Sequence, residues 1–127
     1  LTIGAAVVER MIRHRRKGAV INIGSVVARG NAGQSAYSAS KAGVHALTMT
    51  WAMEFAGLGL RFVTIEPGFV ETPSMRSATP EHVINQIVRE TLSGRLVSPE
   101  EIAHAVIFAL ENASLNATRL RIDGGLV

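Results

Sequence analysis

Ala19-Val20-Ile21-Asn22-Ile23-Gly24-Ser25 has the composition of a buried strand followed by a turn, and this stretch sets the fold class. Residues 19–23 are apolar and rich in β-branched side chains, as in strands covered on both faces. Residues 25–34 are small and rich in glycine, which predicts a loop. A helical pattern then runs from about Ser35 to Ala56. A strand, a loop and a long helix in this order indicate one unit of a parallel sheet.

The flanking segments continue the alternation of helices and strands. Upstream, apolar residues at helical spacing predict a helix that ends near Lys17: Ile3, Val7, Val8, Met11 and Ile12. Downstream, residues 61–65 predict a second strand, which Pro67-Gly68 stops. Residues 69–79 have no regular pattern, so we expect them to be irregular.

Two further helices and a last strand complete the chain. Thr79 followed by Pro80 predicts the start of a helix that runs to about Leu92. Ser98-Pro99-Glu100-Glu101 matches a capping box and opens a helix that runs to about Asn112. Residues 118–122 predict a strand, turned by Asp123-Gly124-Gly125. This order predicts an α/β fold whose parallel strands carry helices on both faces.

The best candidate for chemistry is the pair Tyr37 and Lys41. Because they are four residues apart on the predicted helix, their side chains project from one face. A nearby ammonium lowers the pKa of a phenol from about 10, which makes the phenol a useful acid and base. The pair alone is a weak signal, since it also fits a solvated helix face. Ser25 strengthens it, because ligands of such sheets bind beyond the carboxyl ends of the strands, where Ser25 and Pro67-Gly68 lie.

Composition and charge limit the other possibilities. The chain has 127 residues, 47% hydrophobic and 18% charged, a balance typical of one globular domain over residues 1–127. Without cysteine there is no disulfide or thiolate metal site, and the four histidines lack metal-ligand spacing, so we expect no metal. We find no secretory leader and no apolar run of membrane length, and we expect a cytoplasmic protein without a membrane partner.

Much of the net charge of +3 comes from one basic run, residues 13–17. These cations fit the C-terminus of a helix, where they complement the helix dipole. A docking patch for an acidic partner, such as a carrier protein or nucleic acid, is the alternative. The run is short and has no interleaved aromatic residues, so the helix-dipole interpretation is favoured and no nucleic-acid partner is expected.

Four segments together resemble the second half of the short-chain dehydrogenase/reductase family. They are Val20-Ile21-Asn22-Ile23-Gly24-Ser25, Tyr37-Ser38-Ala39-Ser40-Lys41-Ala42-Gly43, Pro67-Gly68-Phe69-Val70-Glu71-Thr72 and Asp123-Gly124-Gly125. The likeness covers essentially the whole chain. It implies the C-terminal part of a Rossmann-type doubly wound parallel sheet, without the N-terminal half that binds the nucleotide phosphates.

This resemblance assigns roles to particular residues. It implies that Tyr37 is the acid/base, that Lys41 lowers its pKa and holds the nicotinamide ribose, and that Ser25 orients the substrate carbonyl. Residues that would bind NAD(H) or NADP(H) are Tyr37, Lys41, Pro67, Gly68, Val70 and Thr72. Those that would contact the substrate are Ser25, Gln34 and Phe69. Hydride would pass between the nicotinamide ring and a carbonyl or alcohol carbon.

Details within the family narrow the substrate. The segments Ser25-Val26-Val27 and Gly30–Gln34 look like 3-oxoacyl-(acyl-carrier-protein) reductases, and residues 111–124 look closer to 3-hydroxyacyl-CoA dehydrogenases. Both act on the β-carbon of an acyl thioester, which is therefore the expected substrate. The family also implies a homodimer or homotetramer of the full-length parent.

The sequence departs from the family at several points. The glycine-rich turn that binds the pyrophosphate in the family's first half is absent, and neither Gly30–Gly33 nor Gly57–Gly59 replaces it, so we expect a fragment that binds dinucleotide poorly. The alternative function is a catalytically inactive remnant that acts as an oligomerisation or interaction module. The loop from Ser25 to Tyr37 is one residue shorter than usual. Glu66 replaces a small or neutral residue, and Val97 and Ala117 stand where glycine is common, which costs stability if their φ is positive.

Overall fold

The sheet of the protein is parallel throughout. The computed structural model describes residues 2–127, in which three strands pair in the order β1-β2-β3. These are β1 (Gly18–Ile23), β2 (Leu60–Pro67) and β3 (Thr118–Ile122). Val20 aligns with Phe62 and Ile65 with Leu120, both in parallel register. The predicted α/β class and the predicted strands are confirmed.

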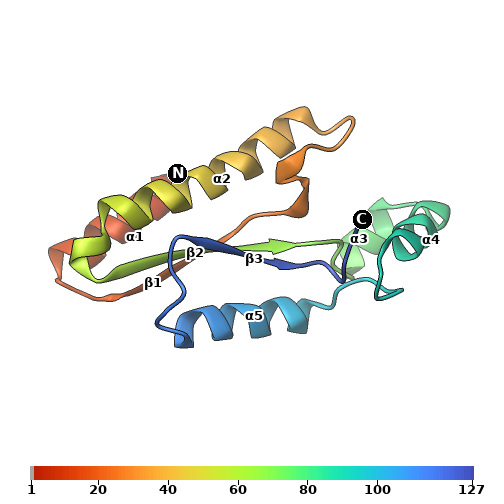
Figure 1. Ribbon diagram of the computed structural model, residues 1–127. Coiled ribbons are helices and arrows are strands. Elements are labelled where there is room, and N and C mark those ends of the chain that lie inside the picture. The colour runs from red at the N-terminus through yellow and green to blue at the C-terminus, as the bar shows by residue number, and fades with distance from the viewer. Residues whose placement is uncertain (1) are drawn as a thin grey trace.

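Helices cover both faces of this sheet (Figure 1). One face carries α1 (Thr2–Arg13) and α2 (Ser35–Glu54), and the other carries α5 (Pro99–Glu111). The short helices α3 (Pro73–Ala78) and α4 (Glu81–Glu90) lie together at the end of the sheet where β2 finishes. Two 3₁₀ turns, η1 (Val26–Arg29) and η2 (Ala56–Leu58), follow β1 and α2.

Three predictions about the helices are wrong. The first helix ends at Arg13 and not near Lys17, because Arg15 adopts the left-handed conformation with φ 50° and turns the chain toward β1. Residues 69–79, expected to be irregular, contain α3, whose N-cap Thr72 accepts a hydrogen bond from the Met75 amide. Thr79 is the C-cap of α3 and not the N-cap of the next helix. That N-cap is Pro80, which was expected to be the first helical residue.

The face under α5 is packed with aliphatic side chains. Val63 and Ile65 of β2 are fully buried against Ala105 and Ala109 of the helix. The small alanines allow the helix backbone to approach the sheet closely. The predicted capping box is present, since Ser98 and Glu101 each bond the backbone amide of the other.

The face under α2 is apolar at one end only. Near the start of β2, Val8, Ala52, Leu60 and Phe62 form a core to which Trp51 adds an edge-on contact with Phe62. Trp51 is thus a packing residue. Toward the carboxyl end of β2 the buried side chains become polar.

Thr48 is the centre of that polar layer. Its hydroxyl accepts hydrogen bonds from Asn22 Nδ2 and Thr64 Oγ1, each at 2.9 Å, and donates to the Val44 carbonyl. Farther along β2, Glu66 is 1% exposed, and its carboxylate lies 3.5 Å from Arg119 Nη1 of β3. Neither carboxylate oxygen of Glu66 has a hydrogen-bond partner within residues 2–127. Helix α2 therefore rests on a layer that is polar and includes a buried charge.

Arg61 holds the end of α5 against the sheet, and two residues where glycine is common differ in backbone conformation. Arg61 of β2 donates hydrogen bonds to the carbonyls of Ala109, Leu110 and Leu115, which end α5 and begin the following turn. Ala117 has φ 51°, so the condition for a cost in stability is met at this position. Val97 does not have a positive φ and forms an isolated bridge with Val70, so the condition is not met there.

Candidate active site

The carboxyl ends of β1 and β2 form one wall of a cavity of about 300 Å³. Ser25 lies two residues beyond the last residue of β1, and Pro67 ends β2. Helix α2 supplies the opposite wall, because η1 and the glycine-rich loop bring its first turns back over the strand ends. The lining residues are Ile23, Gly24, Ser25, Val26, Val27, Gln34, Tyr37, Lys41, Pro67, Gly68, Phe69 and Val70.

Lys41 is oriented by the sheet. Its Nζ donates a hydrogen bond to the carbonyl of Ile23, the last residue of β1, at 3.0 Å. The same nitrogen lies 5.7 Å from the centroid of the Tyr37 ring. Since Tyr37 is 47% exposed, its hydroxyl is accessible to a ligand in the cavity. The structure thus places an ammonium beside a phenol, with one of its three N–H groups already used.

Ser25 is held by a local hydrogen bond. Its Oγ accepts from the Val27 amide at 3.4 Å, because Ser25 is the N-cap of η1. The hydroxyl proton has no acceptor among the hydrogen bonds of residues 2–127, so it is free to donate to a carbonyl oxygen. Ser25, Tyr37 and Lys41 therefore share one cavity, although the loop between the serine and the tyrosine is one residue shorter than usual.

Most of the other predicted contact residues line the same cavity. Pro67, Gly68 and Val70, expected at the cofactor, and Gln34 and Phe69, expected at the substrate, are all present. Thr72 does not line the cavity. Its hydroxyl caps α3 by accepting a hydrogen bond from the Met75 amide.

The sequence interpretation missed Ile23, Gly24, Val26 and Val27 as lining residues. They flank Ser25 in the chain. Because they are adjacent to a candidate catalytic residue, the sequence could have predicted them as lining residues. Gly24 is required by packing, because a Cβ atom there would lie 2.7 Å from Cγ2 of Thr64. Gly24 thus allows the end of β1 to lie close to β2, and this contact fixes the position of the next residue, Ser25.

Asp123 supports the floor of the cavity from behind. A Cβ atom on Gly68 would lie 2.7 Å from the Cβ of Asp123, so only glycine allows this contact. Asp123 is itself buried, pairs with Arg121 and accepts a hydrogen bond from the Gly125 amide. The Asp123-Gly124-Gly125 turn therefore positions the Pro67–Gly68 wall.

An ion-pair cluster holds α3 beside the cavity. Arg76 of α3 pairs with Glu71 at 2.5 Å and lies 3.8 Å from Glu81 of α4. The hydrogen bonds that Arg76 donates to the Glu71 carboxylate raise the pKa of Arg76, and the charges of Glu71 and Glu81 add to this effect. The cluster connects the segment after β2 to both short helices.

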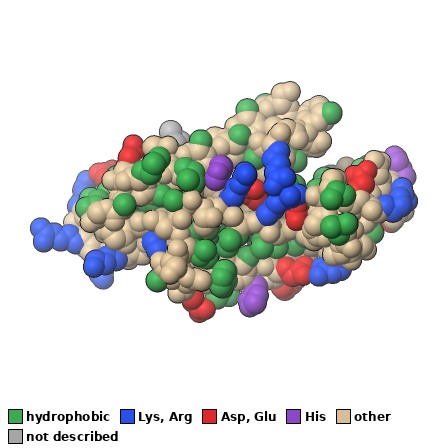
Figure 2. Space-filling view, in the orientation of Figure 1, with side chains coloured by type: hydrophobic (Ala, Val, Ile, Leu, Met, Phe, Trp, Pro, Cys, Tyr) green, Lys and Arg blue, Asp and Glu red, His purple; other side chains and the backbone are tan. Residues whose placement is uncertain are grey.

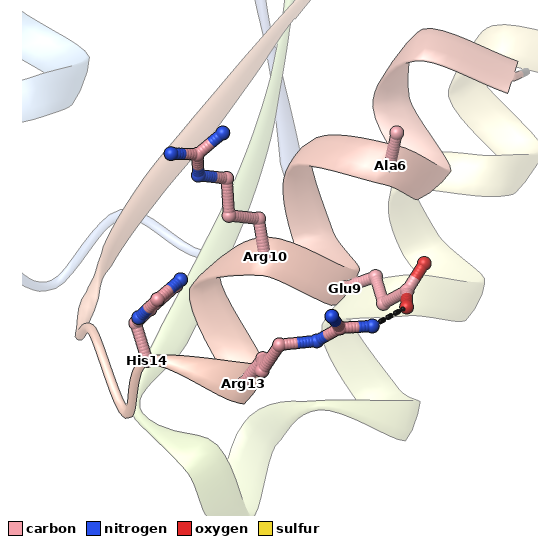
Figure 3. A pocket seen from close by; sticks show the side chains of 5 residues that line it. All are labelled: Ala6, Glu9, Arg10, Arg13 and His14. Atoms are coloured by element: carbon pink, nitrogen blue, oxygen red, sulfur yellow. Dashed lines mark hydrogen bonds and ion pairs between the residues drawn. The ribbon is translucent and has the colours of Figure 1, made fainter.

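A second cavity, of about 250 Å³, lies on α1 far from the catalytic residues (Figure 3). It is lined by Ala6, Glu9, Arg10, Arg13 and His14. Arg13 is paired with Glu9 at 2.6 Å, while the Arg10 side chain points away from this pair. β1 runs from this end of the sheet to the end that carries Ser25, so these cations do not belong to the catalytic cavity.

Within residues 2–127, no group of three or more His, Cys, Asp or Glu side chains is arranged to hold a metal ion. No helix in that part of the chain is long and apolar enough to cross a membrane.

Comparison with known proteins identifies relatives of this arrangement. The family model described as enoyl-(acyl carrier protein) reductase matches residues 1–127. The 3-oxoacyl-(acyl-carrier-protein) reductase FabG of Thermotoga maritima is 43% identical over 95% of this chain and 50% of its own length. The (3R)-3-hydroxyacyl-CoA dehydrogenase of Homo sapiens is 37% identical over 95% of this chain and 47% of its own.

Solved structures share the fold. A protein titled ribose-5-phosphate isomerase from Brucella melitensis has a TM-score of 0.88 at 32% identity, over 96% of this chain and 48% of the other. A short chain dehydrogenase/reductase family protein has a TM-score of 0.84, also at 32% identity, over 95% of this chain and 50% of the other. The chain spans about half the length of these relatives.

Proposed function

The chain belongs to the short-chain dehydrogenase/reductase family, and from this premise we propose that it carries the catalytic residues of an NAD(P)-dependent oxidoreductase. The reaction would interconvert a carbonyl and an alcohol on a 3-oxoacyl or 3-hydroxyacyl thioester. One observation carries the proposal, namely that a single cavity contains Ser25, Tyr37 and Lys41 together with the Pro67–Val70 wall.

The roles of the three side chains follow from their positions. The hydroxyls of Ser25 and Tyr37 would both donate hydrogen bonds to the substrate carbonyl oxygen and hold it in place. In the reducing direction Tyr37 would give its proton to that oxygen, and in the oxidising direction it would take the proton back. The Lys41 ammonium stabilises the resulting phenolate by its charge.

The residues present fit the nicotinamide end of a dinucleotide. Lys41 uses one N–H on the Ile23 carbonyl, so two remain for ribose hydroxyls. The wall formed by Pro67, Gly68 and Val70 is largely apolar, which suits a planar ring. When bound, the nicotinamide would supply or accept the hydride. We assign no residue of this chain to the pyrophosphate, because residues 2–127 contain no short Gly-x-Gly-x-x-Gly turn between a strand and a helix, and the longer loop from β1 to α2 contains Ser25 and η1 instead.

The substrate class rests on the relatives. Two of them are named for a 3-oxoacyl group on an acyl carrier protein and a 3-hydroxyacyl group on coenzyme A. An acyl thioester with oxygen on its β-carbon is the chemistry that both names share. A homodimer or homotetramer of the protein that carries this chain belongs to the same proposal.

Tyr37→Phe tests the assignment, because it removes the transferable proton and keeps the ring. We expect kcat for the NADH- or NADPH-dependent reduction of an acetoacetyl thioester to fall by about 10²- to 10⁴-fold in the protein that carries this chain. Ser40→Ala is the matched control on the same helix, since the Ser40 hydroxyl is bound to the Tyr37 carbonyl and lies outside the cavity. Unchanged turnover in Tyr37→Phe would show that the proposed chemistry is wrong.

A further inference from the structure

A second hollow adjoins the catalytic cavity, and we call it the Arg29 groove. It has a volume of about 540 Å³ and shares Val26, Val27 and Phe69 with the catalytic cavity. A hydrogen bond of 3.1 Å also connects them, from Asn31 of the groove to Gln34 of the cavity. Figure 2 shows the surface hollowed between the start of α2 and the block formed by α3 and α4, with Lys and Arg side chains gathered nearby.

Three charged side chains line the groove, whereas Lys41 is the charged side chain that lines the catalytic cavity. Ile87 and Leu126 provide an apolar floor, while Arg29, Glu90 and Arg121 bring charges to it. A hydrocarbon tail would bury these charged side chains against carbon, which is costly. A ligand that carries amides and a charge matches this lining better.

The three charged side chains of the groove have different partners. Arg121 is paired with Asp123 and also donates to the Leu126 carbonyl, and Glu90 accepts a hydrogen bond from Gln86. Arg29, at the end of η1, has no ion pair or side-chain hydrogen bond with any residue of 2–127. It is therefore the cation of the groove that remains available to an anionic ligand, and a guanidinium is well suited to a phosphate.

We propose that the Arg29 groove binds the phosphopantetheine arm of an acyl thioester, with Arg29 on its phosphate. This inference rests on the proposed function, because it takes the thioester carbonyl to lie at Ser25 and Tyr37. The acyl tail and the phosphopantetheine arm extend in different directions from this part of the substrate. The adjoining groove, with its three charged side chains, suits the arm, whose amides and phosphate need hydrogen-bond partners. Coenzyme A and a carrier protein present the same arm.

Calorimetric titration of the 127-residue chain with 4′-phosphopantetheine and with unphosphorylated pantetheine tests the proposal directly. We expect the phosphorylated arm to bind about tenfold more tightly, the gain of one charge-assisted contact. Arg29→Gln should abolish this difference, and Arg29→Lys should keep part of it. Arg89→Gln is the matched control, because it removes an exposed cation of α4 that does not line the groove.

The outcomes separate this inference from the proposed function. Equal losses in Arg29→Gln and Arg89→Gln, no preference for the phosphate, or no binding of either arm would each overturn it. Tyr37→Phe should not change arm binding, so that variant reports on the chemistry alone. Titrations with coenzyme A and with a phosphopantetheine-bearing carrier protein then identify the source of the arm, and binding of neither would contradict the proposal.

Discussion

The two faces of the sheet are built in different ways. Under α5, Val63 and Ile65 pack against alanines in a layer made only of carbon. Under α2, the same strand presents Thr64 and Glu66, which are as deeply buried but polar. Successive residues of one strand thus alternate between a dry face and a polar one. The catalytic helix lies on the polar face.

This difference separates stability from chemistry. Apolar burial scales with area and does not depend on direction, so the α5 face contributes stability without needing exact orientations. Hydrogen bonds are directional, and the contacts from Thr64 and Asn22 to Thr48 fix the rotation of α2 about its own axis. A fixed rotation keeps Tyr37 and Lys41 aimed at the ends of the strands.

Ile65→Ala should show the largest effect, because it removes three buried carbons from the dry face. We expect the free energy of unfolding to fall by about 2–5 kcal/mol, measured by urea denaturation. The neighbouring Thr64→Val removes one hydrogen bond from the polar face and should cost only about 1 kcal/mol. Equal losses from the two variants would break the contrast between the faces.

Glu66→Gln tests whether the buried charge on the polar face lowers stability. The Glu66 carboxylate is buried without a hydrogen-bond partner in residues 2–127, and its one ion-pair partner, Arg119, is 45% exposed in its side chain. Since Arg119 can be hydrated once the pair is lost, removing the buried charge should raise the free energy of unfolding by about 1 kcal/mol. Urea denaturation measures this change. A loss of stability would show that the pair is net favourable.

The smallest expected effect concerns the start of α5, the helix that covers the dry face, where protonation of Glu101 at low pH should reduce stability. The Glu101 carboxylate accepts hydrogen bonds from Arg95 and from the Ser98 amide, and these lower its pKa from 4.5 to about 2. Because the folded-state pKa is depressed, this contribution is complete above pH 4.5 and is lost as the pH falls toward 2.

Glu101→Gln should therefore lower the melting temperature at neutral pH, and its gap from the unchanged protein should close as the pH falls toward 2. Thermal unfolding followed by circular dichroism across this range measures both effects. Glu100→Gln, on the exposed side of the same first turn, is the control and should show no such pH-dependent gap. If the difference in melting temperature between Glu101→Gln and the unchanged protein did not vary with pH, the lowered pKa of Glu101 would be contradicted.

Local spacing was sufficient to predict most elements and the three candidate catalytic residues. Tyr37 and Lys41 fall on one helix, and Ser25 follows a strand, so near neighbours in the chain decide their positions. Helix α3 was missed although Thr72-Pro73 carries the same signal as Thr79-Pro80. Six residues provide too little periodicity to distinguish a helix from a turn.

Long-range contacts account for what the sequence could not predict. The end of α1 is set by Arg15 in a left-handed conformation that glycine usually marks. The Arg29 groove joins residues from η1, α4 and the end of the chain, which no spacing rule connects. The support of Gly68 by Asp123 likewise joins positions that are distant in the sequence.

The three carbonyl contacts of Arg61 have a consequence for local opening. A guanidinium from the first residues of β2 holds the last turn of α5, so that turn cannot fray while β2 stays paired. Amide hydrogen exchange at the end of α5 should then match the slow exchange of the central strand, unlike the ends of most helices. The helix and the strand would open as one cooperative unit, although 48 residues separate Arg61 from Ala109.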